Sequence, residues 1–260
     1  MLPSVFLSHG APTLPLEDVP ATRFLEGLAG QLSERPKAIL VISAHWETTQ
    51  PTVNVVEANA TIHDFYGFPA ALYEIRYPAP GSRALAERVA DLLGEGGQTV
   101  LADHARGLDH GAWVPLQMIY PDADIPVVQL SVQTRLGPKH HLELGRLLAP
   151  LRAEGVLVVG SGSYTHDLSS FREFRDAIAA PEPDWVKRFA DWMTDAIEAG
   201  RTDDLLRYRT LAPQAAHNHP TEEHILPLFV ALGAGEGGPA RHLHASATYG
   251  ILRMDVFAFG

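Results

Sequence analysis

The 260-residue sequence contains no cysteine. This absence excludes a disulfide framework, a cysteine nucleophile, and every zinc or iron–sulfur site that is built on thiolates. A transition-metal site in this chain must therefore use imidazole and carboxylate ligands.

Basic residues and long apolar runs are also scarce. The 20 Lys and Arg residues stand against 31 Asp and Glu residues, which gives a formal net charge of −11. Because non-specific nucleic-acid binding depends on Lys and Arg at the phosphates, we expect no nucleic-acid partner. Apolar runs such as 38–44 and 156–159 are far shorter than the ~20 residues of a membrane span, so we expect no membrane association. Residues 1–9 lack the basic and apolar regions of a signal peptide, and we expect a cytoplasmic protein.

Short β-branched segments alternate with segments of helical periodicity. Strands are predicted at 4–8, 38–43, 52–56, 98–101, 126–131 and 156–161, with one or two more within 245–257. Helices are predicted at 82–93, 142–151, 184–199 and 222–232, the first capped by Ser82 and the third ended by Gly200. This alternation predicts an α/β fold, in which a single domain spanning residues 1–260 has a central, mostly parallel or mixed sheet flanked by helices.

Histidine is unusually frequent, with 13 residues. His9 and His45 follow the first two predicted strands, and His166 lies just beyond a later one. In open α/β sheets, ligands bind outside the carboxyl ends of the strands, so we expect these side chains to converge. We expect three glycines to allow sharp backbone exits from the strands there: Gly10, Gly160 and Gly162. His224 approaches from the start of an apolar helix. The set predicts a shared metal or catalytic site, although any one of these residues taken alone could be a turn or core histidine.

Two further segments combine histidine with aromatic residues. Residues 107–116 contain His110 and Trp113, and residues 61–69 contain Phe65, Tyr66 and Phe68. The segment 107–116 is interpreted as a polar group beside an aromatic wall of a pocket. The segment 61–69 is interpreted as a hydrophobic flap over a flat substrate. The alternatives are a tight turn before a helix and a loop that packs under the core. The remaining polar-context histidines are predicted to lie on the surface: His104, His140, His141, His242 and His244.

Several common catalytic motifs are missing. Residues 160–164 have the wrong spacing for a nucleophile elbow, and Thr165 stands where a dinucleotide fingerprint would have its third glycine. The sequence contains neither a phosphate-binding Walker loop nor a His-Glu-x-x-His zinc motif.

Taken together, eight segments resemble the class III extradiol ring-cleavage dioxygenases, and most closely their DOPA 4,5-dioxygenase-like branch. The similarity runs in order from residue 5 to about residue 233. The segments are 7–12, 43–46, 61–69, 77–81, 107–113, 120–131, 160–168 and 223–228.

The resemblance implies one non-haem divalent metal. His9, His45 and His224 match metal-binding histidines of the family, and His166 matches a residue that is either a fourth ligand or a catalytic acid/base. His110 matches the position that meets the substrate hydroxyl. Fe²⁺ is expected for activity. Zn²⁺ is possible, because His224 stands where other class III enzymes have a carboxylate.

The resemblance also implies the substrates, a catechol such as DOPA together with O2. We expect a monomer or small homo-oligomer. Four aromatic side chains are candidates for the substrate-binding wall: Trp46, Phe65, Tyr66 and Trp113. Two alternatives remain open, because fold does not determine function. One is a zinc-dependent hydrolase, and the other is a non-catalytic metal-binding protein on the same scaffold.

Overall fold

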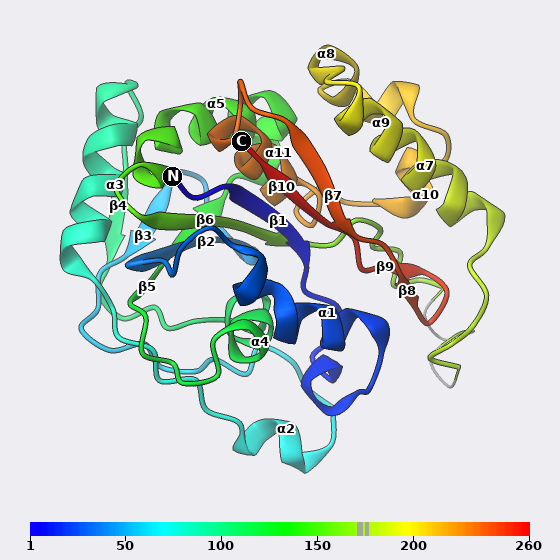
Figure 1. The fold of residues 1–260 in the computed structure, drawn as a ribbon, viewed down its shortest axis with the longest axis horizontal. Helices are drawn as coiled ribbons and strands as arrows, with labels where there is room; N and C mark the ends of the chain where they lie inside the picture. The colour runs from blue at the N-terminus through cyan, green and yellow to red at the C-terminus, as the bar shows by residue number, and fades with distance from the viewer. Residues whose placement is uncertain (171–173, 175–176) are drawn as a thin grey trace.

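The computed structural model describes residues 1–170, 174 and 177–260 (Figure 1). The strands are β1 (Ser4–Ser8), β2 (Ala38–Glu47), β3 (Thr52–Asn54), β4 (Leu101–Asp103), β5 (Val127–Val132), β6 (Val156–Gly162), β7 (Ala240–His244), β8 (Ala247–Thr248), β9 (Leu252–Arg253) and β10 (Val256–Phe259). The helices are α1 (Pro20–Leu28), α2 (Ala70–Glu74), α3 (Arg83–Glu95), α4 (His110–Ile119), α5 (Gly137–Leu148), α7 (Asp184–Glu198), α8 (Thr202–Leu205), α9 (Tyr208–Leu211), α10 (Ala215–Asn218) and α11 (Leu226–Ala234).

One mixed sheet of eight strands runs through the molecule in the order β4-β3-β5-β2-β6-β1-β10-β7. The central strands β5, β2, β6 and β1 are parallel. The strand β10 pairs antiparallel with both β1 and β7, and β3 pairs antiparallel with β5. This arrangement confirms the predicted α/β fold with a mostly parallel or mixed sheet.

Helices cover both faces of the parallel strands, as their continuous apolar sequences require. On one face, α1 and α4 pack over core residues that include Val41 and Val159. On the other face, α3, α5 and α11 pack over residues such as Leu40 and Val158 (Figure 1). The helix α11 lies between β6 and α5 and is almost entirely buried, which explains why it is apolar all round.

The predicted helix ends are largely confirmed. The Ser82 hydroxyl accepts the backbone N–H of Leu85, and Gly200 adopts a left-handed φ of 64° directly after α7. The helix predicted at 222–232 begins only at Leu226, because Pro227 is suited to the first turn of a helix. The strand predicted at 98–101 lies slightly later, at β4, and the helix predicted at 142–151 begins earlier, at Gly137. The prediction missed α1, β7 and the short helices α2, α8, α9 and α10.

Three glycines at the carboxyl end of the sheet were expected to allow sharp exits from strands. Gly10 does so, with a φ of 70° directly after β1. Gly160 and Gly162 instead lie within β6, so that expectation was wrong for them. A Cβ atom at Gly162 would overlap the backbone oxygen of His224. The missing side chain therefore allows the segment before α11 to approach the sheet and delivers His224 to its edge.

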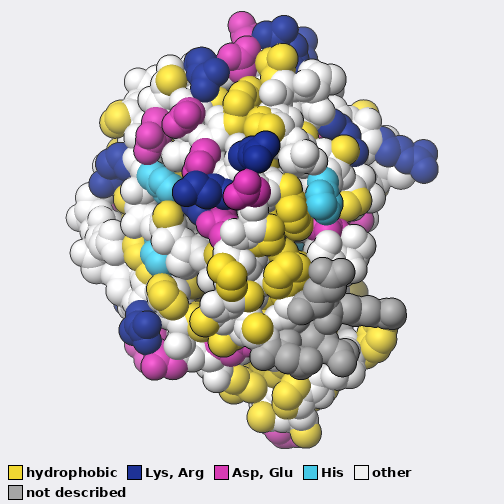
Figure 2. All heavy atoms as spheres, turned by 90° about the vertical axis from the view of Figure 1, so that its right-hand side faces the viewer, with side chains coloured by type: hydrophobic (Ala, Val, Ile, Leu, Met, Phe, Trp, Pro, Cys, Tyr) yellow, Lys and Arg dark blue, Asp and Glu magenta, His cyan; other side chains and the backbone are white. Residues whose placement is uncertain are grey.

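The surface mixes charges of both signs. On the face shown in Figure 2, hydrophobic side chains gather in the centre and lower part of the view, and acidic and basic side chains lie interspersed around them. Within the described part of the chain, no helix is both long and apolar enough to span a membrane.

Candidate metal centre

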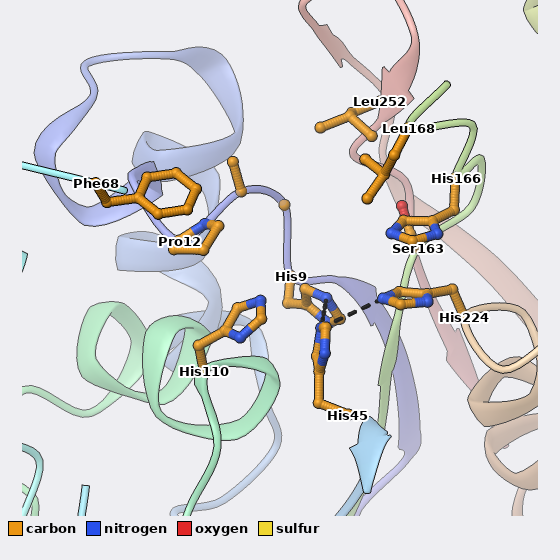
Figure 3. A pocket seen from close by; sticks show the side chains of 12 residues that line it. His9, Pro12, His45, Phe68, His110, Ser163, His166, Leu168, His224 and Leu252 are labelled. Carbon is orange, nitrogen blue, oxygen red and sulfur yellow. Dashed lines mark hydrogen bonds between the residues drawn. The ribbon is translucent and has the colours of Figure 1, made fainter. Parts of the chain in front are cut away.

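Three imidazoles converge at the carboxyl end of the sheet (Figure 3). His9 directly follows β1, His45 lies near the end of β2, and His224 precedes α11. The Nε2 atom of His45 lies 3.0 Å from Nε2 of His9 and 3.3 Å from Nε2 of His224. The geometry thus brings these three side chains together, and their role as ligands of one metal stays a prediction.

The orientation of the His9 ring is set by a hydroxyl group. Nδ1 of His9 lies 3.1 Å from Oγ of Ser161, which itself donates its hydrogen to the carbonyl of Gly111. The hydroxyl must therefore accept from His9, and Nδ1 carries the proton. Nε2 is then left with a free lone pair that faces the other two rings.

Carboxylates contact the same ring atom in the other two histidines. Nδ1 of His224 lies 2.9 Å from Oε1 of Glu223, and Nδ1 of His45 lies 3.7 Å from Oδ2 of Asp64. Burial alone would raise the pKa of Asp64, but contacts with His110 and His45 lower this pKa to about 2. A carboxylate within hydrogen-bond distance of Nδ1, as Glu223 is at His224, favours the proton on that atom and makes Nε2 a better metal ligand. The 3.7 Å between Asp64 and His45 is too long for such a hydrogen bond.

The cluster fits a divalent metal ion. Imidazole nitrogens typically bind a metal at ~2.1 Å. Two nitrogens bound to one metal at that distance lie about 3.0–3.4 Å apart when the angle between their bonds is between 90° and the tetrahedral value. The Nε2 atom of His45 lies at such distances from those of His9 and His224. Burial, reinforced by neighbouring imidazoles, lowers the pKa of His9 and His224 well below the usual value and that of His45 to about 3. All three rings are therefore neutral at pH 7, which is the form that binds a metal.

Two further imidazoles flank the cluster. The ring of His166 stacks on that of His224 with centroids 3.4 Å apart and planes 11° from parallel. The centroid of the His110 ring lies 3.9 Å from that of His45. Burial, together with His45 and His110, lowers the pKa of His166 to about 4.

A buried carboxylate places His110 at the start of α4. Asp109 is the N-cap of this helix and accepts the backbone N–H of Ala112. Its side chain is fully buried and also binds Oγ of Ser43 at 2.7 Å and Nη2 of Arg106 at 2.8 Å. The first turn of α4, and with it His110, is thereby tied to β2.

The five histidines form one end of a cavity of about 270 Å³. Its other walls are apolar and include Pro12, Phe68, Leu168 and Leu252 (Figure 3). This volume lies just below the ~300–1,000 Å³ range of ligand pockets, so the cavity suits a small single-ring molecule.

Comparison with known proteins agrees with this geometry. Residues 3–255 match the family described as the catalytic LigB subunit of aromatic ring-opening dioxygenase. The chain belongs to this family. The resemblance predicted from the sequence motifs is thus confirmed, and with it the enzyme class, an extradiol ring-cleavage dioxygenase.

Similar proteins cover nearly the whole chain. A 4,5-DOPA dioxygenase extradiol of Beta vulgaris is 49% identical over 258 residues, which cover 98% of this chain and 95% of that protein. A protein of the same name from Escherichia coli K12 is 43% identical over 242 residues, which cover 91% of this chain and 86% of its own. The crystal structure of an uncharacterized Escherichia coli K12 protein superposes with a TM-score of 0.81 at 35% identity and covers 100% of both chains.

Two of the aromatic candidates lie away from the cavity of the dioxygenase. Trp46 is buried beneath the guanidinium of Arg106, which lies 5.1 Å from the ring centroid. It follows His45 in β2, and successive side chains of a strand point to opposite faces. Trp113 is completely buried, and its Nε1–H donates to the carbonyl of Ile62 at 2.9 Å.

The other two candidates lie on the loop before α2. The ring of Phe65 packs against that of His110 at a centroid distance of 5.8 Å, behind the cavity wall. Tyr66 is 93% exposed. The neighbouring Phe68 is the aromatic residue of this loop that lines the cavity.

Some functional candidates were missed from the sequence. Asp64 and Glu223 lie within segments that carry the family resemblance, yet their contacts with His110, His45 and His224 become visible only when distant segments meet. The sequence signal for Glu223 was its position directly before His224. His141, predicted to lie on the surface, is in fact fully buried. It lies in α5 and faces the residue directly after β5, where its Nε2 accepts the backbone N–H of Gln133 at 3.1 Å.

Proposed function

We propose that this dioxygenase opens the aromatic ring of a catechol such as DOPA beside its hydroxyl groups and inserts both atoms of O2. We propose further that His9, His45 and His224 hold one Fe²⁺ ion for this reaction. The observation that carries the proposal is the convergence of their Nε2 atoms at the end of a cavity sized for a single ring.

The metal and the side chains have separate tasks in this proposal. Bound Fe²⁺ supplies the open coordination positions at which a catechol and O2 can lie side by side. The chain's own residues orient the substrate, exclude water and move protons. Apolar walls such as Phe68, Leu168 and Leu252 hold the ring and keep bulk water from the reacting carbons.

Proton transfer is assigned to the two flanking imidazoles. A catechol must lose its hydroxyl protons to act as a chelating ligand. A neutral histidine can accept such a proton near pH 7, and it can return a proton when the ring opens. His110 and His166 line the cavity on opposite sides of the cluster and lie within reach of a bound ring (Figure 3).

Ring stacking favours His166 as the acid/base over a fourth metal ligand. The lone pair of an imidazole nitrogen lies in the plane of its ring. The nearly parallel rings of His166 and His224 have centroids 3.4 Å apart. The lone pairs of His166 therefore lie in a plane stacked on that of His224, so His9, His45 and His224 would hold the metal and His166 would be left to transfer protons.

Zinc is the alternative metal, and the donor set supports it, because three imidazoles also form catalytic zinc sites. The experiment compares anaerobic reconstitution of the metal-free protein with Fe²⁺ or Zn²⁺, followed by addition of a catechol and O2. We expect O2 uptake and a yellow ring-opened product with Fe²⁺ only. Ester or amide hydrolysis by the Zn²⁺ form, with no O2 uptake by either form, would support the hydrolase instead.

A further inference from the structure

Asp64 contacts one imidazole of the metal cluster and one flanking imidazole, and the flanking contact is closer. Its Oδ1 accepts the backbone N–H of His110 at 2.9 Å and lies 3.0 Å from Nδ1 of the same residue. Its Oδ2 lies 3.7 Å from Nδ1 of His45. Nδ1 of His110 is buried, and it is not aligned for a regular hydrogen bond with any described group. The Asp64 carboxylate is therefore the nearby charge that determines how this ring is held.

Glu223 makes the corresponding pair of contacts on the other side of the cluster, but with the order reversed. Its Oε1 lies 2.9 Å from Nδ1 of His224 and 4.0 Å from Nδ1 of His166. The hydroxyl of Thr221 donates to the same oxygen at 3.0 Å. The Glu223 side chain is only 14% exposed. Its closer partner is thus an imidazole of the metal cluster.

We propose that Asp64 and Glu223 are positioning residues with divided tasks. Asp64 holds His110 with its proton on Nδ1, so that Nε2 is free to act on the substrate. Glu223 holds His224 with its proton on Nδ1, so that Nε2 is free for the metal. Both carboxylates contact Nδ1 atoms, whereas the Nε2 atoms of His45 and His224 face each other. We therefore assign both carboxylates to act through the imidazoles rather than as ligands.

The activity part of this inference rests on the proposed function, and the metal-binding part does not. The test uses Asp64→Asn and Glu223→Gln, which remove the charge but keep size and one acceptor oxygen. Glu57→Gln, at an exposed carboxylate shortly before the same loop, is the matched control. Zn²⁺ affinity is measured by calorimetric titration of the metal-free proteins. The turnover number and KM for DOPA are measured after anaerobic loading with saturating Fe²⁺.

The two variants should differ in which property they lose, Zn²⁺ affinity or turnover number. We expect Glu223→Gln to weaken Zn²⁺ binding ~10–100-fold, the usual cost of losing a carboxylate behind a ligand histidine. Asp64→Asn should keep its Zn²⁺ affinity within about threefold of the parent and lose ~10–100-fold in turnover number, with a smaller change in KM. Asp64→Glu, which restores the charge, should recover part of the turnover, and Glu57→Gln should match the parent.

Opposite results would overturn the proposal. Asp64→Asn losing as much Zn²⁺ affinity as Glu223→Gln would make Asp64 part of the metal site, and unchanged affinity in both would remove the role of Glu223. If the Fe²⁺-loaded parent does not act on a catechol, the proposed function fails, and the Zn²⁺ titrations still decide the assignment of Glu223. Circular dichroism verifies folding, and Glu223→Asp repeats the comparison if Glu223→Gln does not fold.

Discussion

Nε2 of His45 lies 3.3 Å from Nε2 of His224, although 179 positions separate the two residues in the sequence. The contact depends on the packing of the segment before α11 against β6. At Gly162, a Cβ atom would overlap the backbone oxygen of His224, so only glycine allows this approach. The proposed metal centre is therefore a product of backbone packing as much as of its ligands.

Replacing a proposed ligand should remove the metal. In His224→Ala, two imidazoles remain, and the cluster loses one of three Nε2 donors. We expect metal content to fall from about one ion per chain to under a tenth of that, with matching loss of ring-cleavage activity. Elemental analysis of protein dialysed against trace Fe²⁺ measures this. His104→Ala, at an exposed histidine, should retain its metal. Full metal content in His224→Ala would remove His224 from the ligand set.

Replacing a flanking imidazole should spare the metal and slow the reaction. His166→Ala and His110→Ala are expected to bind one ion each and to lose ~10²–10⁴ in turnover number, the usual contribution of a general acid or base. His110→Ala should also raise KM, because this residue is proposed to meet the substrate hydroxyl. Metal analysis and steady-state kinetics on the same samples decide the outcome. If His166→Ala loses its metal as completely as His224→Ala, His166 is a fourth ligand.

A methyl group at Gly162 should disturb both stability and metal binding. Its Cβ would collide with backbone rather than with a flexible side chain, so the segment before α11 must shift. Overpacking of this kind costs about 1–3 kcal/mol, and the free energy of unfolding of Gly162→Ala should fall by that amount. Gly94→Ala in α3 is the control, because a Cβ atom at Gly94 would meet nothing within 4 Å. Urea denaturation and Zn²⁺ titration of both variants test the prediction, and equal behaviour would contradict it.

Acid should destabilise the fold through His141. The pKa of this residue is lowered to about 4, chiefly by burial. Its Nε2 atom accepts the backbone N–H of Gln133. In the unfolded chain the pKa is about 6.5, so between about pH 6.5 and pH 4 the unfolded state binds the extra proton. Stability is therefore highest above pH 6.5 and decreases as the pH falls, by on the order of 3 kcal/mol for this residue.

The variant His141→Gln separates this effect from the other histidines. It should be less stable than the parent at pH 7, because it loses two hydrogen bonds, to Gln133 and Gly137. Between pH 6.5 and pH 4, however, its free energy of unfolding should decrease with a slope smaller by about one proton. Urea titrations at several pH values give both slopes. Identical slopes would mean that His141 does not contribute to the acid sensitivity.

The parts of the site that follow local sequence rules could be predicted. His9 and His45 stand near the ends of parallel apolar strands, and such ends share one edge of a sheet. Trp46 was proposed as a substrate-binding residue because it stands beside His45 in the motif. Successive side chains of β2 point to opposite faces, so Trp46 points away from His45. The contacts of Asp64 and Glu223, and the burial of His141, depend on which distant segments meet. A single sequence does not contain that information.

The most direct test of the proposed dioxygenase activity is the stoichiometry of O2 uptake per metal and per catechol. The metal-free parent is loaded anaerobically with increasing Fe²⁺, and O2 consumption with DOPA is followed by an oxygen electrode. We predict that activity rises to a plateau at one Fe²⁺ per chain, with one O2 consumed per DOPA and no such activity in His45→Ala. Equal O2 uptake by the metal-free parent, or by Fe²⁺-loaded His45→Ala, would contradict a single metal centre built on these histidines.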